Sequence, residues 1–371
     1  MALTIGSNDV RIWEVFGQHI AEHGLVQTYL VLDGGPAAPV PVFNHPPLAG
    51  LWVALCWWVS NLTGLRFAIA LKAAGLAAEF ATARILWLVW KQKAGSERAW
   101  KVVAAYSLGL CAILVSAFHG NTDCVYAMLV LLAAFLFAGG RPLPAGLALA
   151  LAINVKLIPV FAIPAFFAAC RDWKTFTRFV AGLAVGVLPF VPVLLLIPAQ
   201  FAKNVLSYTP NLEHWGVVGI MLLSSETRRL GSVMPETIAL YVQYSKVLLV
   251  FAIGGAAVWA RRARVDVFVS VLLALTLFLV LTPGFGVQYT VLLCPILFAV
   301  SLRWGWAWTT VAGLFIFVPY FVFMESTFPW ESGFRTRYPH PAPLLGFLAW
   351  VLLLQLVAAI LRRRFSRAAA P

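Results

Sequence analysis

The chain has 371 residues, of which 62% are hydrophobic and only 11% are charged. Soluble domains carry about 25% charged residues, so the composition excludes an ordinary soluble enzyme. The net charge of +13 would suggest nucleic-acid binding in a soluble protein. In a membrane protein it is better explained by basic residues that gather in short cytoplasmic loops. Long apolar runs recur without the alternating pattern of membrane strands, which predicts an all-α, polytopic transmembrane helical bundle.

The first 65 residues are polar to mixed and precede the part that spans the membrane. They include an apolar helix over residues 46–63, which we expect to lie on the outer surface rather than to cross. Residues 66–371 are expected to form the bundle, so the whole chain, 1–371, is a single domain with about 11 spans. The predicted spans are 66–90, 102–118, 124–139, 143–155, 157–170, 179–197, 238–260, 265–281, 289–302, 305–324 and 343–361.

Several of these segments are shorter than the roughly 20 residues that a straight span needs, among them 143–155 and 157–170. Segments 143–155 and 157–170 meet at Asn154-Val155-Lys156. A membrane helix that breaks in this way is tolerated where a polar cavity exists. The pair is therefore predicted to be two half-helices beside such a cavity.

The distribution of basic residues predicts the orientation of the helices. Six loops hold 16 of the 27 Lys and Arg residues and are therefore placed in the cytoplasm: 91–101, 141, 171–178, 261–264, 303 and 362–367. The other polar segments then fall together on the outer side: the N-terminal segment, 119–123, 198–237, 283–289 and 325–342. This topology leaves the N-terminus outside, so we expect one further span to precede the given sequence.

Two acidic residues, Asp9 and Glu14, lie in the polar segment near the N-terminus. One interpretation is that Ser7, Asn8 or Asp9 caps the start of an amphipathic helix. The other is that Asp9 is a general base at the lip of a membrane cavity, where it takes a proton from a hydroxyl nucleophile. Capping does not exclude catalysis, so both interpretations stay open.

Basic and histidine side chains are the second set of candidates. His45 comes directly before two prolines that begin a helix, and it could donate a hydrogen bond to a phosphate. Lys72 lies within the span 66–90, where a charge is either functional or snorkels to the interface. Lys156 has no acid near it in the sequence, which favours an anionic ligand.

Two outer turns supply further polar side chains. Segment 118–123 is either a plain polar hairpin or part of a site. In segment 283–289 two glycines break a span, and backbone amides at such a break can bind an anion. The candidates from these turns are His119, Asn121, Asp123, Gln288 and Tyr289.

Arg335 and Arg337 lie in a loop predicted to be outside, against the orientation bias. An anionic lipid headgroup or a diphosphate would explain them. The sequence contains no Walker loop, GxSxG or HExxH motif, and its six histidines and five cysteines have no metal-ligand spacing. We therefore expect neither a cofactor nor a metal.

Taken in order, these motifs resemble the GT-C superfamily of integral membrane glycosyltransferases. The likeness is greatest to the mannosyl- and glucosyltransferases that use polyprenyl- or dolichyl-phosphate sugars, and it covers nearly the whole chain. It rests on D-x-x-x-W (Asp9, Trp13), H-P-P-L (45–48), Lys72, H-G-N-T-D (119–123), L-x-I-N-V-K-L (151–157) and G-x-G-V-Q-Y (284–289).

The resemblance implies an inverting transferase that moves a hexose, of mannose or glucose type, from a polyprenyl-phosphate donor to a lipid-linked or glycan hydroxyl. Residues 1–65 would be an outer catalytic loop carrying the acid, Asp9. The donor phosphate would lie near Lys72, Lys156, His45, His119, Arg335 and Arg337. The substrates would also contact Glu14, Asn121, Asp123, Gln288 and Tyr289.

The partners implied are the donor, a glycolipid or glycan acceptor and membrane lipids, with no nucleic acid. The short loops and the lack of a soluble domain suggest a bacterial plasma membrane, with the site on the periplasmic face. A secondary transporter or a lipid or glycan flippase is the alternative, because charged spans and broken helices also occur there. A transporter predicts inverted repeats and charges near the midplane, whereas the polar clusters here gather on one side.

Overall fold

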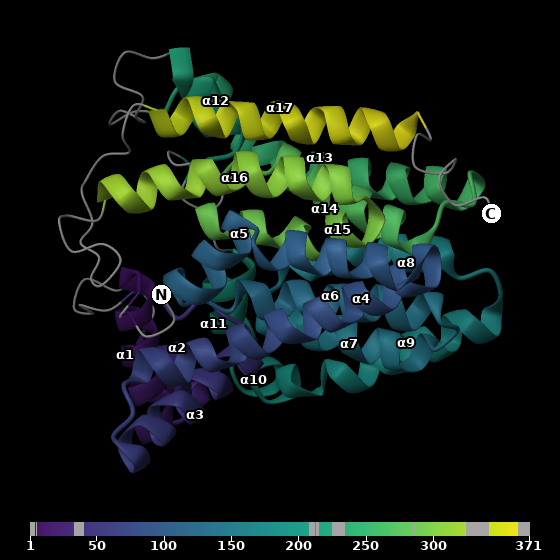
Figure 1. The fold of residues 1–371 in the computed structure, drawn as a ribbon. Helices are drawn as coiled ribbons and strands as arrows, with labels where there is room; N and C mark the ends of the chain where they lie inside the picture. The colour runs from purple at the N-terminus through teal and green to yellow at the C-terminus, as the bar shows by residue number, and fades with distance from the viewer. Residues whose placement is uncertain are drawn as a thin grey trace.

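The computed structural model describes residues 4, 6–32, 41–207, 212, 215–224, 234–284, 286–323 and 341–362. Over these residues the chain forms helices and contains no β-strand. The helices lie side by side in a bundle, with the N-terminal helices at one end and the C-terminal end of the last helix, Pro341–Leu361, at the other (Figure 1). The all-α prediction is confirmed for the described part of the chain.

Three helices form the N-terminal part: α1 (Asn8–His23), α2 (Leu25–Val31) and α3 (Pro47–Thr63). Gly24, with φ of 86°, lets the chain turn directly from α1 into α2. α3 packs along α1, and their backbones are so close that a methyl group at Gly17 would meet the carbonyl of Val53. This packing holds α1 against the rest of the molecule.

Helix α4 (Phe67–Ser107) runs through the segment 91–101, which is predicted to be a loop. The connection predicted here is present as a tight turn, because helical backbone geometry is interrupted at Ala94 and Gly95. The chain reverses at this turn, since Ser116 hydrogen-bonds to Glu79 and Gly120 lies beside Lys72. The rest of the segment is helical, so the loop is shorter than predicted. Apart from Gly95, the segment consists largely of good helix formers and has no proline. The chain continues through α5 (Leu110–Ala112) and the π-helix η1 (Ile113–His119), which bend by 46° from α4.

The break predicted at residues 154–156 is present. α6 (Asp123–Ala138) is followed by α7 (Pro142–Val155), η2 (Ile158–Ala162) and α8 (Ile163–Ala169). Lys156 is extended, with φ of −156° and ψ of 141°, so the helix stops there. The Asn154 side chain donates to the carbonyl of Gly186 over 2.8 Å and fixes this break to the next helix.

The next helices are α9 (Trp173–Gly186), η3 (Leu188–Phe190), α10 (Val191–Leu196), α11 (Pro198–Phe201), η4 (Ala202–Leu206), α12 (Val217–Met221) and η5 (Leu222–Ser224). Asp172 caps α9 by accepting a hydrogen bond from the Thr175 amide at 2.8 Å. Gly146 and Gly182 bring α7 and α9 into close contact, because a methyl group at either would meet the facing backbone.

The C-terminal half of the bundle consists of α13 (Glu236–Arg262), α14 (Val267–Leu281), η6 (Val287–Leu293), α15 (Cys294–Val300), α16 (Leu302–Phe323) and α17 (Pro341–Leu361). The interruption between α14 and η6 matches the predicted break at 283–289. α16 packs on α17 and α15, and its C-terminal end lies at the same end of the bundle as α1 (Figure 1).

Three described stretches are long and apolar enough to cross a membrane: Trp173–Leu196, Glu236–Arg262 and Leu344–Leu361. The bent pair formed by α4 and α5–η1 would be a fourth, and five further apolar helices are shorter. Helix length alone therefore does not confirm the predicted number of spans. α3 is not among these stretches, and its place on the outer surface stays a prediction.

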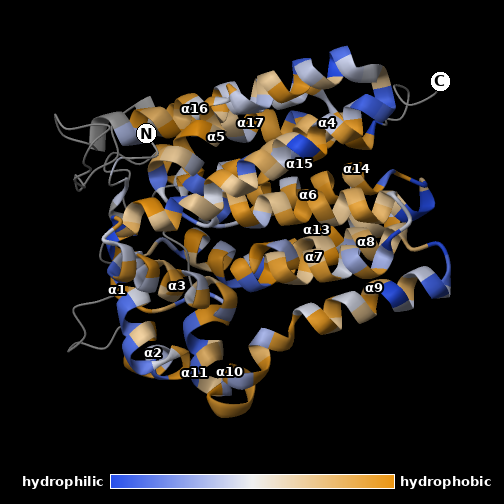
Figure 2. Ribbon diagram, turned by 60° about the horizontal axis from the view of Figure 1, so that its bottom comes forward, coloured by the Kyte–Doolittle hydropathy of each residue, from blue (hydrophilic) through white to orange (hydrophobic). Residues whose placement is uncertain are grey.

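Hydrophobic residues cover much of α6 and α7, while hydrophilic segments lie toward the two ends (Figure 2). Two predicted cytoplasmic loops meet at the end opposite α1. The Arg261 guanidinium donates to the Cys170 carbonyl over 2.7 Å, and Arg171 donates to the Arg261 carbonyl over 3.1 Å. These contacts bring basic residues from different loops to one end of the bundle.

Candidate active site

A cavity of about 330 Å³ lies between the N-terminal helices and the broken helices of the bundle. Its wall combines apolar side chains, including Trp13, Phe16 and Val205, with polar ones. The polar side chains come from segments far apart in the sequence: Asp9, Asn44, His45, Asn121, Lys156, Gln288 and Tyr289. Six of these seven are predicted site residues, so the cavity brings together half of the twelve residues predicted.

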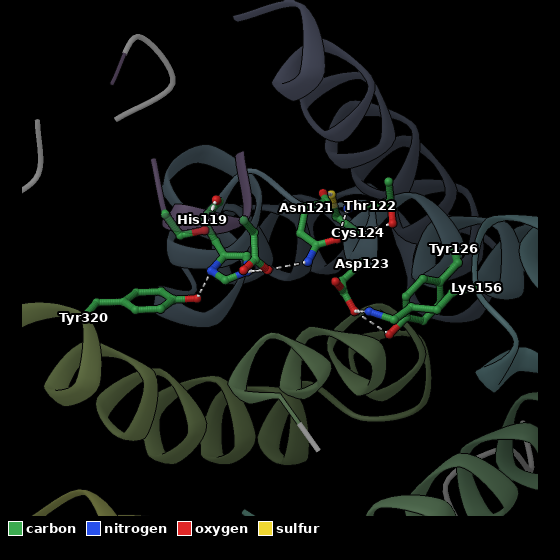
Figure 3. A network of polar contacts seen from close by, with 10 residues as sticks. His119, Asn121, Thr122, Asp123, Cys124, Tyr126, Lys156 and Tyr320 are labelled. Carbon is green, nitrogen blue, oxygen red and sulfur yellow. Dashed lines mark hydrogen bonds and ion pairs between the residues drawn. The ribbon is translucent and has the colours of Figure 1, made fainter. Parts of the chain in front are cut away.

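Asp9 lies in the first turn of α1, and its side chain is 30% exposed. Its Oδ2 atom accepts hydrogen bonds from the His119 ring at 3.0 Å and from the Asn121 amide at 3.1 Å. Within the described residues, Oδ1 has no hydrogen-bond partner. One carboxylate oxygen is therefore anchored and the other is open to a ligand (Figure 3 shows the anchoring side chains).

Burial raises the pKa of the Asp9 carboxyl, but the favourable electrostatic interaction with the His119 ring and the hydrogen bond from its N–H outweigh the effect of burial. Lys156 and His45 act in the same direction as His119, and the pKa lies below its ordinary value of 3.8. Asp9 is therefore ionised at neutral pH. An ionised carboxylate only accepts hydrogen bonds, which is the state that a general base requires.

The segment before α1 is tied to the turn that carries His119. Ser7 donates to the His119 carbonyl from its amide at 3.2 Å and from its hydroxyl at 2.8 Å. Ser7 occupies the N-cap position, but its hydroxyl does not cap the helix. Lys72 of α4 donates to the Thr4 carbonyl at 2.8 Å. Lys72 thus holds this segment and does not line the cavity.

Lys156 lies at the helix break and is bound on two sides. Its Nζ atom is 2.8 Å from Oδ1 of Asp123 and 4.1 Å from the centre of the Tyr289 ring. The Tyr126 hydroxyl donates to the same Asp123 oxygen at 2.9 Å (Figure 3). Asp123 is fully buried behind the cavity, and its Oδ2 has no hydrogen-bond partner among the described residues. The lysine is held by a buried carboxylate and still reaches the cavity wall.

His45 lies between Phe43 and the start of α3, and its ring packs on Trp13 with the ring centres 4.2 Å apart. Its backbone carbonyl accepts a hydrogen bond from Tyr29. Burial and the charge of Lys156 lower the pKa of His45 to about 3, although Asp9 acts in the opposite direction. The ring is therefore neutral at physiological pH and can donate one hydrogen bond.

The remaining predicted site residues lie elsewhere. Glu14 is on the exposed face of α1, and His119 and Asp123 are buried behind the cavity wall. Arg335 and Arg337 lie outside the described residues. No group of three or more His, Cys, Asp or Glu side chains that could hold a metal ion is found in the described ranges.

Two tyrosines of the site are absent from the sequence-based prediction. Tyr320 of α16 is 2.6 Å from the His119 ring, and Tyr126 of α6 contacts Asp123. Each is a single polar group inside an apolar run, which is a weak signal because buried tyrosines are common in helical cores. Asn44 also lines the cavity, and its place beside His45 could have indicated this.

A helical membrane protein with an acidic, lysine-bearing cavity at one end fits the class of membrane glycosyltransferases that its motifs resemble. Residues 43–283 match the family model of glycosyltransferase family 87. The match covers well over half of the chain, and the protein therefore belongs to this family of GT-C-type membrane glycosyltransferases. A comparison with curated proteins found no match. The matched range includes His45, Asn121 and Lys156, whereas Asp9 and Tyr320 lie outside it.

Proposed function

We propose that the protein is an inverting glycosyltransferase that uses a polyprenyl-phosphate-linked hexose, of mannose or glucose type, as its donor. The acceptor is a hydroxyl of a lipid-linked saccharide or glycan on the outer face of the membrane. One observation carries this proposal: the Asp9 carboxylate and the Lys156 ammonium line the same cavity, although 147 positions separate them in the sequence. A base for the acceptor and a cation for the leaving phosphate are what such a transfer requires.

In the proposed reaction, the acceptor oxygen bonds to the anomeric carbon from the face opposite the phosphate. The bond from this carbon to the phosphate oxygen breaks, and its electron pair leaves with the phosphate. The acceptor proton passes to Oδ1 of Asp9, the open oxygen of the carboxylate. Lys156 and the neutral His45 ring stabilise the charge that builds on the phosphate.

The other predicted residues enter the proposal according to their places. Asn121 orients Asp9, and Gln288 and Tyr289 line the substrate side of the cavity. A role in binding the donor phosphate stays a prediction for Lys72, His119, Arg335 and Arg337, as does a substrate contact for Glu14 and Asp123. The proposed reaction needs no metal or nucleotide, because the leaving group is already an anion.

The proposal also includes the architecture inferred from the charge distribution. About eleven spans cross a bacterial plasma membrane, and several are broken or short. The N-terminal helices and the cavity face the periplasm, and the basic loops face the cytoplasm. A lipid-linked donor would then reach the cavity from the outer leaflet.

The decisive experiment replaces the base. Asp9→Asn is expected to abolish sugar transfer from polyprenyl-phosphate-mannose and polyprenyl-phosphate-glucose in detergent, while donor binding persists. Glu22→Gln removes an exposed carboxylate from the same helix and is expected to leave transfer unchanged. Retained turnover in Asp9→Asn would remove Asp9 from the role of base. Movement of donor across vesicles without any sugar transfer would favour the flippase alternative.

A further inference from the structure

A contact between Tyr320 and His119 lies behind the proposed base and has no part in the reaction as described. The Tyr320 hydroxyl is 2.6 Å from Nδ1 of His119. The two rings are also stacked, with their centres 5.5 Å apart and their planes 19° from parallel (Figure 3). Tyr320 and His119 are 6% and 5% exposed, so the contact is closed to bulk water.

The other ring nitrogen of His119 faces Asp9. Nε2 is 3.0 Å from Oδ2 of Asp9, and an ionised carboxylate can only accept a hydrogen bond. Nε2 must therefore carry a hydrogen whenever Asp9 is charged. In the neutral imidazole this leaves a bare lone pair on Nδ1, and a buried acceptor of this kind needs a donor. The Tyr320 hydroxyl is the donor that the structure provides.

The backbone of His119 is held independently of its ring. Its carbonyl accepts two hydrogen bonds from Ser7, and the next residue, Gly120, is fixed in a left-handed turn with φ of 74°. The orientation of the ring is then left to the two contacts of its nitrogens. Loss of the Nδ1 contact would permit the other tautomer, in which the lone pair of Nε2 faces the lone pairs of Asp9.

We propose that Tyr320 is a positioning residue that selects the Nε2–H tautomer of His119 and thereby keeps the Asp9 carboxylate ionised and aimed at the cavity. The inference rests on the proposed role of Asp9 as the base. Tyr320 is not part of the cavity lining, and its proposed effect on Asp9 passes through the histidine. It joins the C-terminal end of α16 to a site whose other members come from the first half of the chain and from η6.

Other charged or titratable groups also surround Asp9, and Tyr320→Phe changes none of them. They are Lys156, His45 and Tyr289 at the cavity wall, and Lys72 near the turn at Gly120. Removal of the Tyr320 hydroxyl in a His119→Gln background separates an effect that passes through His119 from any other effect. The stacked ring itself is retained in the phenylalanine variant.

The first test reads the tautomer directly and needs no substrate. NMR of the full-length protein labelled with ¹⁵N-histidine in detergent reports which nitrogen of each imidazole carries the hydrogen, and His119→Gln identifies the signal. We expect the Nε2–H form in the wild type and a mixture of both tautomers in Tyr320→Phe. Tyr241→Phe removes a hydroxyl bound to the Leu281 carbonyl and serves as the matched control, with an unchanged His119 signal. An unchanged signal in Tyr320→Phe overturns the inference.

The second test is the pH dependence of transfer from polyprenyl-phosphate-mannose or -glucose. Loss of one hydrogen bond is expected to move the acid limb of kcat/KM to higher pH, with about fivefold lower activity at pH values below that limb and near-normal activity at pH 8. In the His119→Gln background, Tyr320→Phe should have no further effect. A loss that is the same at every pH contradicts the inference. Turnover in Asp9→Asn contradicts the proposed base itself, so the two failures are distinguishable.

Discussion

Lys156 contacts both a carboxylate and an aromatic ring, and these two contacts have different consequences. The Asp123 carboxylate is fully buried, so the lysine is its necessary counter-charge. The Tyr289 ring offers its face to the same ammonium at the cavity wall. An ammonium that already has a buried partner keeps its charge without a ligand. It therefore presents a cation to the cavity before the phosphate of the proposed donor binds.

This pairing predicts that stability and donor binding can be separated. Lys156→Met should destabilise the protein by about 3–5 kcal/mol, because it leaves Asp123 buried without its cation. Adding Asp123→Asn should restore most of the melting temperature in detergent, while binding of a polyprenyl-phosphate sugar stays weak. If the double variant binds donor as the wild type does, Lys156 has only a structural role.

The neutral state of His45 predicts a pH dependence of stability. The pKa of His45 in the folded protein lies below its ordinary value of 6.5. Below pH 6.5 the histidine therefore binds a proton in the unfolded chain but stays neutral in the folded protein. Stability should therefore fall as the pH drops from about 6.5. His45→Asn is expected to flatten this decline in melting temperature, whereas His23→Asn, at an exposed position of α1, should not. Equal declines in both variants would contradict the assignment.

At the scale of elements, the carboxylate of the proposed base, Asp9, is positioned by the junction of α1 with the turn after η1. Gly6 and Gly120 both have positive φ, and the two segments touch along their backbones. A methyl group at Gly120 would lie 2.6 Å from Val10, the neighbour of Asp9. Close approach at this turn places Asp9 beside His119 and Asn121, and a bulkier residue would push the first turn of α1 away.

A pair of glycine substitutions tests this junction. Gly120→Ala should lower activity strongly, because it adds the clash with Val10 to the strain of a left-handed alanine, about 1–2 kcal/mol. Gly64→Ala carries the same strain, since φ is 70°, but its added methyl meets open space. The backbone strain should lower the melting temperature of both variants. The transfer rate should fall in Gly120→Ala alone. Equal activity of the two would show that the junction tolerates displacement.

The breaks in the helices were predictable, whereas the contacts across them were not. Asn154-Val155-Lys156 interrupts an apolar run, and the glycines before Gln288 interrupt another, so local composition alone located these points. The pairing of Lys156 with Asp123 depends on how two helices rotate against each other, and no local pattern encodes this. The basic segment 91–101 correctly located a reversal of the chain, at Ala94 and Gly95, but not its length. Charge in a loop and charge on an exposed helix end give the same sequence signal.

At the scale of the whole molecule, the cavity and the basic loops lie at opposite ends of the bundle. The charge bias predicted this separation, and the clustering of Asp9, His45, Asn121 and Lys156 agrees with it. The order of the motifs along the chain and their predicted side of the membrane were thus enough to indicate where the candidate site lies. The Tyr320 contact joins residues 201 positions apart and needed the packed helices to be found.

The proposed orientation in the membrane can be tested by labelling single cysteines. All five native cysteines are buried, so the background should be low. Glu22→Cys, on the exposed part of α1, should react with an impermeant maleimide in intact cells. Lys174→Cys, at the exposed start of α9, should react only after the membrane is opened. The reverse pattern would place the cavity on the cytoplasmic side.

The size of the cavity has a consequence for how a lipid substrate is used. Ligand pockets usually enclose about 300–1,000 Å³, and the 330 Å³ here lies at the small end of that range. Such a volume suits a sugar and its phosphate, so the hydrocarbon chain of the proposed donor would stay in the bilayer. Carriers with different numbers of isoprene units should then serve about equally well, and selectivity would reside in the headgroup alone.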